Sequence, residues 1–137
     1  MAGELHRPGL QYSVKAASAI NPRKPVTFVG TSELLAVPIG SGLTGVRVNG
    51  FIGGGTVGAS GAEFVTVYEE GNIVKVKAAA SIGVGADAGV ASTNGDLGPV
   101  AQASGTLKWS AGVSLSPAAA GEFFSLYVKP RTLGGNA

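Results

Sequence analysis

The side chains that could do chemistry are few and widely spaced in this sequence. The single histidine, His6, has no serine or carboxylate at a spacing typical of a catalytic site, and cysteine is absent. Asp87 and Asp96 lie among glycines without the ligand spacing of a calcium-binding loop. Glu69 and Glu70 are neighbours in a segment expected to be a solvated turn. The sequence therefore predicts no catalytic residue, no metal site and no cofactor.

A glycine-rich segment resembles a phosphate-binding loop in its sequence pattern alone. Residues 53–58, GGGTVG, match the pattern G-x-G-x-x-G of dinucleotide-binding loops. Such a loop must open a helix whose N-terminus holds the phosphates, whereas residues 59–68 have the pattern of a turn followed by a strand. We interpret the segment as a loop of a β protein. A small nucleotide-binding enzyme is the weaker alternative, and it requires a helix after Gly58.

The composition indicates one small domain with a thin core that is stabilised by assembly. The chain has 137 residues, of which 45% are hydrophobic and only 7% aromatic, so small side chains fill the core. Charged residues make up 13% and the mean hydropathy is +0.31, which favours apolar surface covered by other subunits. Neither a signal peptide nor an uninterrupted apolar stretch of about 18 residues is present, so no membrane contact is expected.

Basic residues are concentrated in the first 25 residues, which also contain prolines. We predict that residues 1–25 form an extended N-terminal arm and that residues 26–137 form a single β domain. No aromatic and arginine-rich stripe continues the arm, so a protein surface is a better partner for it than nucleic acid. A disordered tail is the alternative. The arm residues expected to contact the partner, as an added strand, are Leu5, Arg7, Leu10, Tyr12 and Lys15.

Short β-strand candidates follow the arm, and turn residues separate nearly all of them. They lie at residues 26–29, 34–37, 46–52, 63–68, 73–77, 100–103, 107–109, 113–115 and 122–128. Apolar and polar residues alternate most clearly at 64–68 and 73–77. Residues 69–72, which join those two segments, predict a hairpin turn. Helix candidates are no longer than a single turn.

One sequence pattern occurs twice in the chain. Residues 57–68, VGASGAEFVTVY, are echoed by residues 116–127, SPAAAGEFFSLY. We predict an all-β fold, a compact barrel or sandwich of two related β units at about 26–72 and 73–130, with chance similarity as the alternative. Trp109 and Tyr127 are candidate interface anchors, and ordinary core packing explains them equally well.

The second half of the chain resembles the phage capsid-cement, or head-decoration, family. The resemblance is carried by residues 73–78, 82–90, 111–115 and 118–122 before a last strand, and it covers roughly residues 26–129. It does not explain the basic arm or the glycine-rich loop of residues 50–62. The resemblance implies a non-enzymatic virion protein, assembled in the host cytoplasm, that binds the outside of the capsid and clamps neighbouring major capsid subunits, often as a homotrimer.

A different function class stays open. A β-rich fibre or adhesion module of a virion or cell surface would also be built from short strands, and its loops would bind glycans. Clustered exposed aromatic residues beside polar loops would favour that alternative, and the low aromatic content of 7% argues against it.

Overall fold

The computed structural model describes residues 10–30, 33–39, 47–53, 64–100 and 107–134 of the chain. These residues form strands and no helix, which confirms the predicted all-β class. Accordingly, they contain no helix long and apolar enough to cross a membrane. The strands are β1 Gln11–Ala16, β2 Pro25–Gly30, β3 Leu34–Pro38, β4 Gly50–Ile52, β5 Phe64–Tyr68, β6 Ile73–Lys77, β7 Asp87–Val90, β8 Leu97–Pro99, β9 Leu107–Ser114 and β10 Phe123–Gly134.

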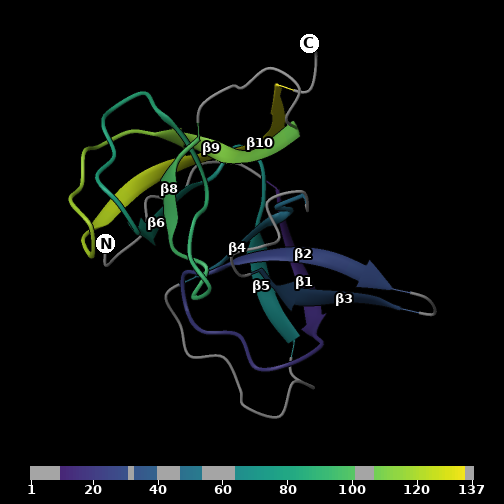
Figure 1. Ribbon diagram of the computed structural model, residues 1–137. Coiled ribbons are helices and arrows are strands. Elements are labelled where there is room, and N and C mark those ends of the chain that lie inside the picture. The colour runs from purple at the N-terminus through teal and green to yellow at the C-terminus, as the bar shows by residue number, and fades with distance from the viewer. Residues whose placement is uncertain (1–9, 31–32, 40–46, 54–63, 101–106, 135–137) are drawn as a thin grey trace.

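The first five strands close into a small barrel in the order β1-β3-β2-β4-β5. Figure 1 shows this barrel apart from the second group of strands, with β2 and β3 running side by side away from that group. Alternating residues point inward, so that Val65 and Val67 are buried while Phe64 and Thr66 are exposed. The barrel core contains Val14, Ala16, Ile20, Val26, Ala36, Ile52, Val65 and Val67.

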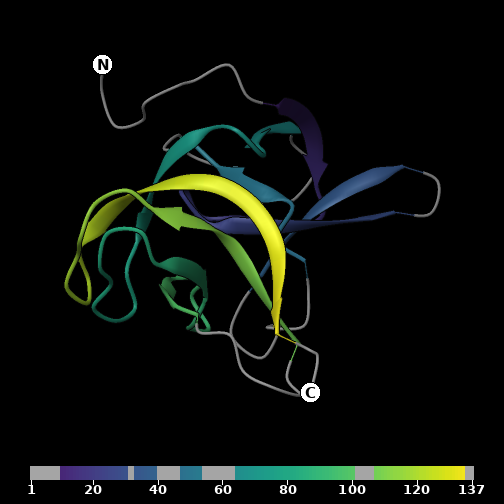
Figure 2. The ribbon, with the colours of Figure 1, turned by 90° about the horizontal axis from the view of Figure 1, so that it is seen from above.

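The last five strands form a sheet in the order β6-β10-β9-β7-β8. In Figure 2 the long strand β10 curves along β9 toward the C-terminus. Its register against β9 shifts between Val128 and Arg131, where a β-bulge lets the strand bend. Phe124, Leu126, Val74 and Val76 are buried on the inner face of this sheet.

The two groups of strands have the same topology. In each group the first strand pairs antiparallel with the fifth, the fifth with the fourth, the fourth with the second and the second with the third. The third strand then meets the first in parallel, through the β1–β3 ladder in the barrel and through one bridge, Ala78 to Leu97, in the second sheet. We call residues 10–72 the first unit and residues 73–134 the second unit.

The registers match as well as the order. Lys15 pairs with Phe64 as Lys77 pairs with Phe123, and both phenylalanines belong to the repeated sequence pattern. Gly112 of the second unit is equivalent to Gly50 of the first, since Gly50 pairs with the second residue of β2 and Gly112 with the second residue of β7. A Cβ atom on Gly50 would lie 2.6 Å from the carbonyl oxygen of Tyr68, and one on Gly112 would overlap that of Tyr127. Both sites admit only glycine because of the same close approach of two strands.

Two expectations from the sequence differ from the structure. Residues 10–25 are not part of an extended arm, because Gln11–Ala16 pairs with β3 and β5 and buries Val14 and Ala16 in the barrel. The first unit therefore starts before residue 26, and a duplication of the sequence stays a prediction that the shared topology supports. Residues 1–9 of the expected arm lie outside the described residues.

The expected hairpin at residues 69–72 is also wrong. The turn is present, with Gly71 at a φ of 96° and the Asn72 N–H donating to the Glu69 carbonyl at 3.2 Å. However, the strands on either side do not pair with each other, since β5 pairs with β1 and β6 with β10. The turn therefore connects the two units, and each of the two strands pairs with a strand of its own unit.

Candidate functional surfaces

The junction between the two units is an apolar interface edged with charges. Ile39, Val48 and Phe51 of the first unit are buried in the same cluster as the inner residues of the second sheet. At the edge, Lys24 forms a 2.6 Å ion pair with Asp96 across the junction, and both side chains are at least four-fifths buried. The guanidinium of Arg23 lies 5.8 Å from the ring centre of Phe123. The second unit is thus held by both packing and charge.

A second charged group lies at the connection between the units. The guanidinium of Arg47 is 5.8 Å from the ring centre of Trp109 on β9. Burial raises the pKa of the Glu69 carboxyl above its usual value, and the charge of Arg47 lowers it in part. One oxygen of this carboxylate is buried and has no hydrogen-bond partner among the described residues. Glu69 is therefore a partly desolvated carboxyl group at the connection between the units.

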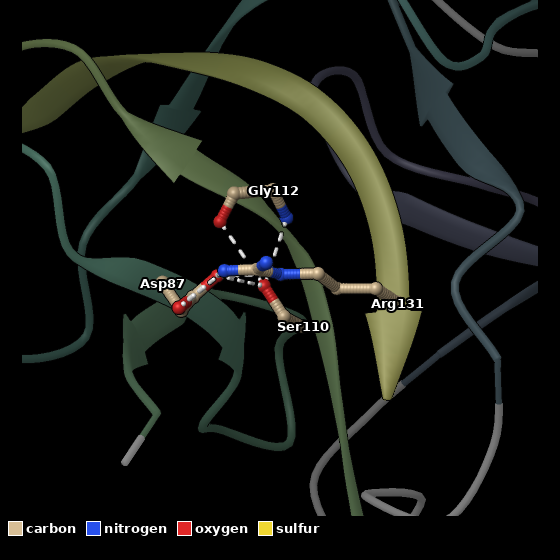
Figure 3. Close-up of polar contacts among 4 residues, drawn as sticks. All are labelled: Asp87, Ser110, Gly112 and Arg131. Carbon is tan, nitrogen blue, oxygen red and sulfur yellow. Dashed lines mark hydrogen bonds and ion pairs between the residues drawn. The ribbon is translucent and has the colours of Figure 1, made fainter. Parts of the chain in front are cut away.

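A polar network closes the far end of the second unit. Figure 3 shows the Arg131 side chain reaching from β10 across β9 to Asp87 on β7. Its Nη2 lies 2.8 Å and 2.9 Å from the two oxygens of Asp87, and Ser110 donates to the same carboxylate at 3.0 Å. The Gly112 N–H donates to the Ser110 hydroxyl at 3.2 Å. The network joins three strands, so the observed role of Asp87 is structural.

The equivalent positions of the first unit are apolar. Where the second unit has Asp87 and Ser110, the matching register of the first unit has Pro25 and Val48. Both are fully buried, and Val48 packs in the core that the two units share. The first unit therefore uses this end to bind the second unit, whereas the second unit covers the same end with Arg131 from the extension of β10.

Each unit also has a row of side chains at equivalent register positions, and in the first unit this row crosses four strands. In the first unit the row consists of Phe64, Lys15, Leu35 and Val29, which are register partners across β5, β1, β3 and β2. Phe64 is 68% exposed and Val29 is 46% exposed. In the second unit the row consists of Phe123, Lys77, Asp96 and Ala91. We call these the first and second outer rows.

A small cleft of about 280 Å³ lies beside the Lys24–Asp96 ion pair. Residues of both units line it, namely Ala19, Asn21, Lys24, Pro38, Ile39, Thr93 and Asn94. The lining offers one cation, which already pairs with Asp96.

Comparison with known proteins places this fold beside a phage structural protein. No protein-family model and no curated protein sequence matches the chain. Among solved structures, the crystal structure of the head fibre gp8.5 N base of bacteriophage phi29 superposes with a TM-score of 0.61. The match covers 88% of this chain and 93% of that chain at 13% sequence identity. This protein shares its fold with the base of a phage head fibre.

The residues predicted to bind a partner lie in several places. Leu5 and Arg7 are outside the described residues. Leu10 and Tyr12 are about half exposed at the start of the barrel, and Lys15 lies in the first outer row, 3.4 Å from Glu33. Partner binding by these residues stays a prediction.

The two predicted interface anchors are partly buried within the molecule. Trp109 lies at the junction of the units beneath Arg47, so it is an anchor between parts of one chain. Tyr127 lies on β10, in register with Ile73 and Val113. Contact of either ring with another protein stays a prediction.

Sequence reasoning missed the first outer row and the contacts of Arg23 and Lys24. The row joins residues that are far apart in the chain, and only the strand register brings them together. The one available signal was the sequence echo, which aligns Phe64 with Phe123.

Proposed function

We propose that this protein is a non-enzymatic structural component of a phage head. It binds the outer surface of the capsid and stabilises the shell by clamping neighbouring major capsid subunits. The observation that carries the proposal is the fold shared with a phage head fibre base, which extends over 88% of this chain and 93% of that one. The resemblance of residues 26–129 to the capsid-cement family points to the same surface of the virion.

The described side chains support a role in binding. Asp87 and Asp96, the carboxylates that could have served chemistry, hold strands and units together through Arg131 and Lys24. Meanwhile Phe64, Tyr12 and Leu10 leave large apolar groups at the surface of the first unit. Exposed apolar side chains on a small rigid body are suited to docking on another protein.

The proposal includes the partners and the assembly. The partner is the major capsid protein, and a homotrimer allows each particle to contact several capsid subunits at once. Linked contacts raise the overall affinity without any new type of contact, so modest individual contacts are sufficient. The protein acts on the virion exterior after assembly in the host cytoplasm, and neither nucleic acid nor membrane takes part.

Co-sedimentation with mature, undecorated phage heads tests this function. The purified chain is titrated onto heads, and the pelleted fraction is measured alongside the temperature at which the heads release DNA. Saturable binding and a higher release temperature are expected. Absence of binding at any concentration would remove the capsid function.

A second candidate is a fibre or adhesion module, which the shared fold with the phi29 head fibre base favours. In that case the protein would present loops that bind glycans. A glycan array distinguishes the two functions, because a glycan-binding module binds a defined glycan and a capsid clamp binds none.

A further inference from the structure

The two outer rows occupy equivalent positions, but among the described residues only the second is contacted by the other unit. We propose that the first outer row is the docking surface for the capsid, and that it receives a loop of the major capsid protein that presents an arginine. This inference rests on the proposed function and assigns its contact surface.

The first outer row consists of three apolar side chains and Lys15 on the outside of the barrel. Phe64 pairs with Lys15, Lys15 with Leu35, and Leu35 with Val29, so the four side chains share one face. Their neighbours along the strands, including Val14, Ala36 and Val65, point into the barrel core. The barrel therefore holds the row in place, while the side chains of Phe64, Leu35 and Val29 stay outside its core.

The second outer row shows what kind of segment fits such a surface. Arg23 of the first unit lies over the ring of Phe123, and the next residue, Lys24, pairs with Asp96. A Cβ atom on Gly95, the residue before Asp96, would lie 3.2 Å from Cδ of Pro25. The segment from Arg23 to Pro25 is therefore in close contact with the second outer row. The occupant of the second outer row is thus a loop that places an arginine over the phenylalanine. Its next residue complements the adjacent side chain of the row.

The first outer row differs from the second in two matched positions. Val29 and Ala91 are both apolar, whereas Leu35 and Asp96 differ in charge. Leu35 takes the place of Asp96, since each lies beside the row lysine of its unit. An occupant of the first row therefore needs an arginine for Phe64 and, beside it, an apolar residue for Leu35. The first of these contacts combines an aromatic anchor with a cation, a combination common at protein interfaces.

A second copy of this chain does not supply such a loop. The equivalents of Arg23 and Lys24 in the second unit are Gly85 and Ala86, which carry no charge. They precede Asp87, whose carboxylate is held by Arg131 at the closed end of that unit. Among the described residues, the equivalent segment of a second copy therefore lacks the arginine, and in the proposed function the occupant is the capsid subunit.

The first test removes the apolar row. Phe64→Ser combined with Val29→Ser is compared with Val84→Ser, which alters a side chain that is 67% exposed on the second unit. All three substituted positions are exposed, so the variants should fold, which circular dichroism checks. The row variant should bind phage heads at least about tenfold more weakly, and the control should bind within about twofold of the original chain.

The second test examines the charge of the occupant. Leu35→Asp loses the apolar contact but should weaken binding less than Leu35→Lys, because the charge of the nearby arginine attracts the aspartate. Leu35→Lys should weaken binding by about tenfold or more, because it repels that arginine. The opposite order would overturn the arginine loop.

The outcomes separate this inference from the function on which it rests. Binding by the original chain that survives loss of the row overturns the docking surface and leaves the capsid function intact. Failure of the original chain to bind heads overturns both. If sedimentation velocity shows self-association that Phe64→Ser abolishes, the row belongs to a second copy and the proposal is overturned.

Discussion

The two units of this protein share strand order and register, yet they use equivalent surfaces in opposite ways. The first unit has an apolar end at Pro25 and Val48, which is covered by the second unit, and an open outer row around Phe64. The second unit has its end closed by Asp87 and Arg131, and its outer row is contacted by Arg23 and Lys24.

This difference follows from the way like units assemble. A head-to-tail contact between two similar bodies leaves one surface of each type without a partner, and it can continue into a filament unless an end is closed. Terminal units of repeat proteins are closed by polar residues for the same reason. Here the closed end belongs to the second unit, so the open surface on the first unit is the one left for another protein.

The largest effect is expected from the matched glycines. Gly112→Ala should destabilise the fold by more than about 4 kcal/mol, because a Cβ atom would overlap backbone atoms of Tyr127 that cannot move aside. Gly50→Ala should cost less, since its nearest contacts are at 2.6 Å and include the side chain of Val67. Urea denaturation measures both values.

Gly83→Ala is the control for the glycine pair, because no atom lies within 4 Å of a Cβ atom built there. Its free energy of unfolding should stay within about 1 kcal/mol of the original. If Gly112→Ala were as mild as this control, the close strand approach shared by the two units would be wrong.

The next effect compares Phe51 and Ile52, two neighbouring residues of β4 whose side chains point into different cores. Phe51→Ala should cost about 3–5 kcal/mol and lower the hydrogen-exchange protection of β6, because Phe51 is buried in the core shared with the second unit. Ile52 points into the barrel core, so Ile52→Ala should lower the protection of β1 and β5 first. Equal protection patterns in both variants would show that the junction is not a distinct interface.

A smaller effect separates two lysine ion pairs. Lys24→Met should cost about 1–3 kcal/mol, because it leaves the carboxylate of Asp96, only 13% exposed, without its partner. Lys15→Met should cost less than about 1 kcal/mol, because Glu33 is 54% exposed and its ion pair is screened by solvent. Thermal denaturation of both variants gives the comparison, and equal losses would argue against a charged junction.

The smallest effect is a pH dependence at Glu69, where the second unit has the buried Val128. Burial raises the pKa of Glu69, so the folded state keeps a proton that the unfolded chain has already released. Stability should therefore fall as the pH rises from the ordinary value of 4.5 through the raised pKa of the folded state. Glu69→Gln should remove this decline in urea denaturation, and an unchanged slope would assign it to another group.

Local pattern predicted the strands that alternate strictly, and long-range pairing decided the others. Residues 73–77 were predicted with the bounds that β6 has. The two segments predicted at 107–109 and 113–115 are parts of one strand, β9, which ends at Ser114. Its Ser110, Ala111 and Gly112 have weak β propensity but are held by β10. Strands β7 and β8 were missed for the same reason, since glycine and alanine supply little alternation.

The candidate surfaces were harder to predict than the strands. Tyr12 and Lys15 were expected on an arm because prolines and basic residues dominate that segment, whereas the parallel pairing of β1 with β3 places them on the barrel. The Arg131–Asp87 contact depends on a bulge after Val128 that no local pattern indicates.

Cryo-electron microscopy of phage heads saturated with this protein tests the central account most directly, because it shows which unit faces the shell. The first unit is expected to contact the capsid through the outer row around Phe64, with an arginine of the major capsid protein against this ring. Density in which the second unit or its Arg131 end faces the shell, with the first outer row in solvent, would contradict it.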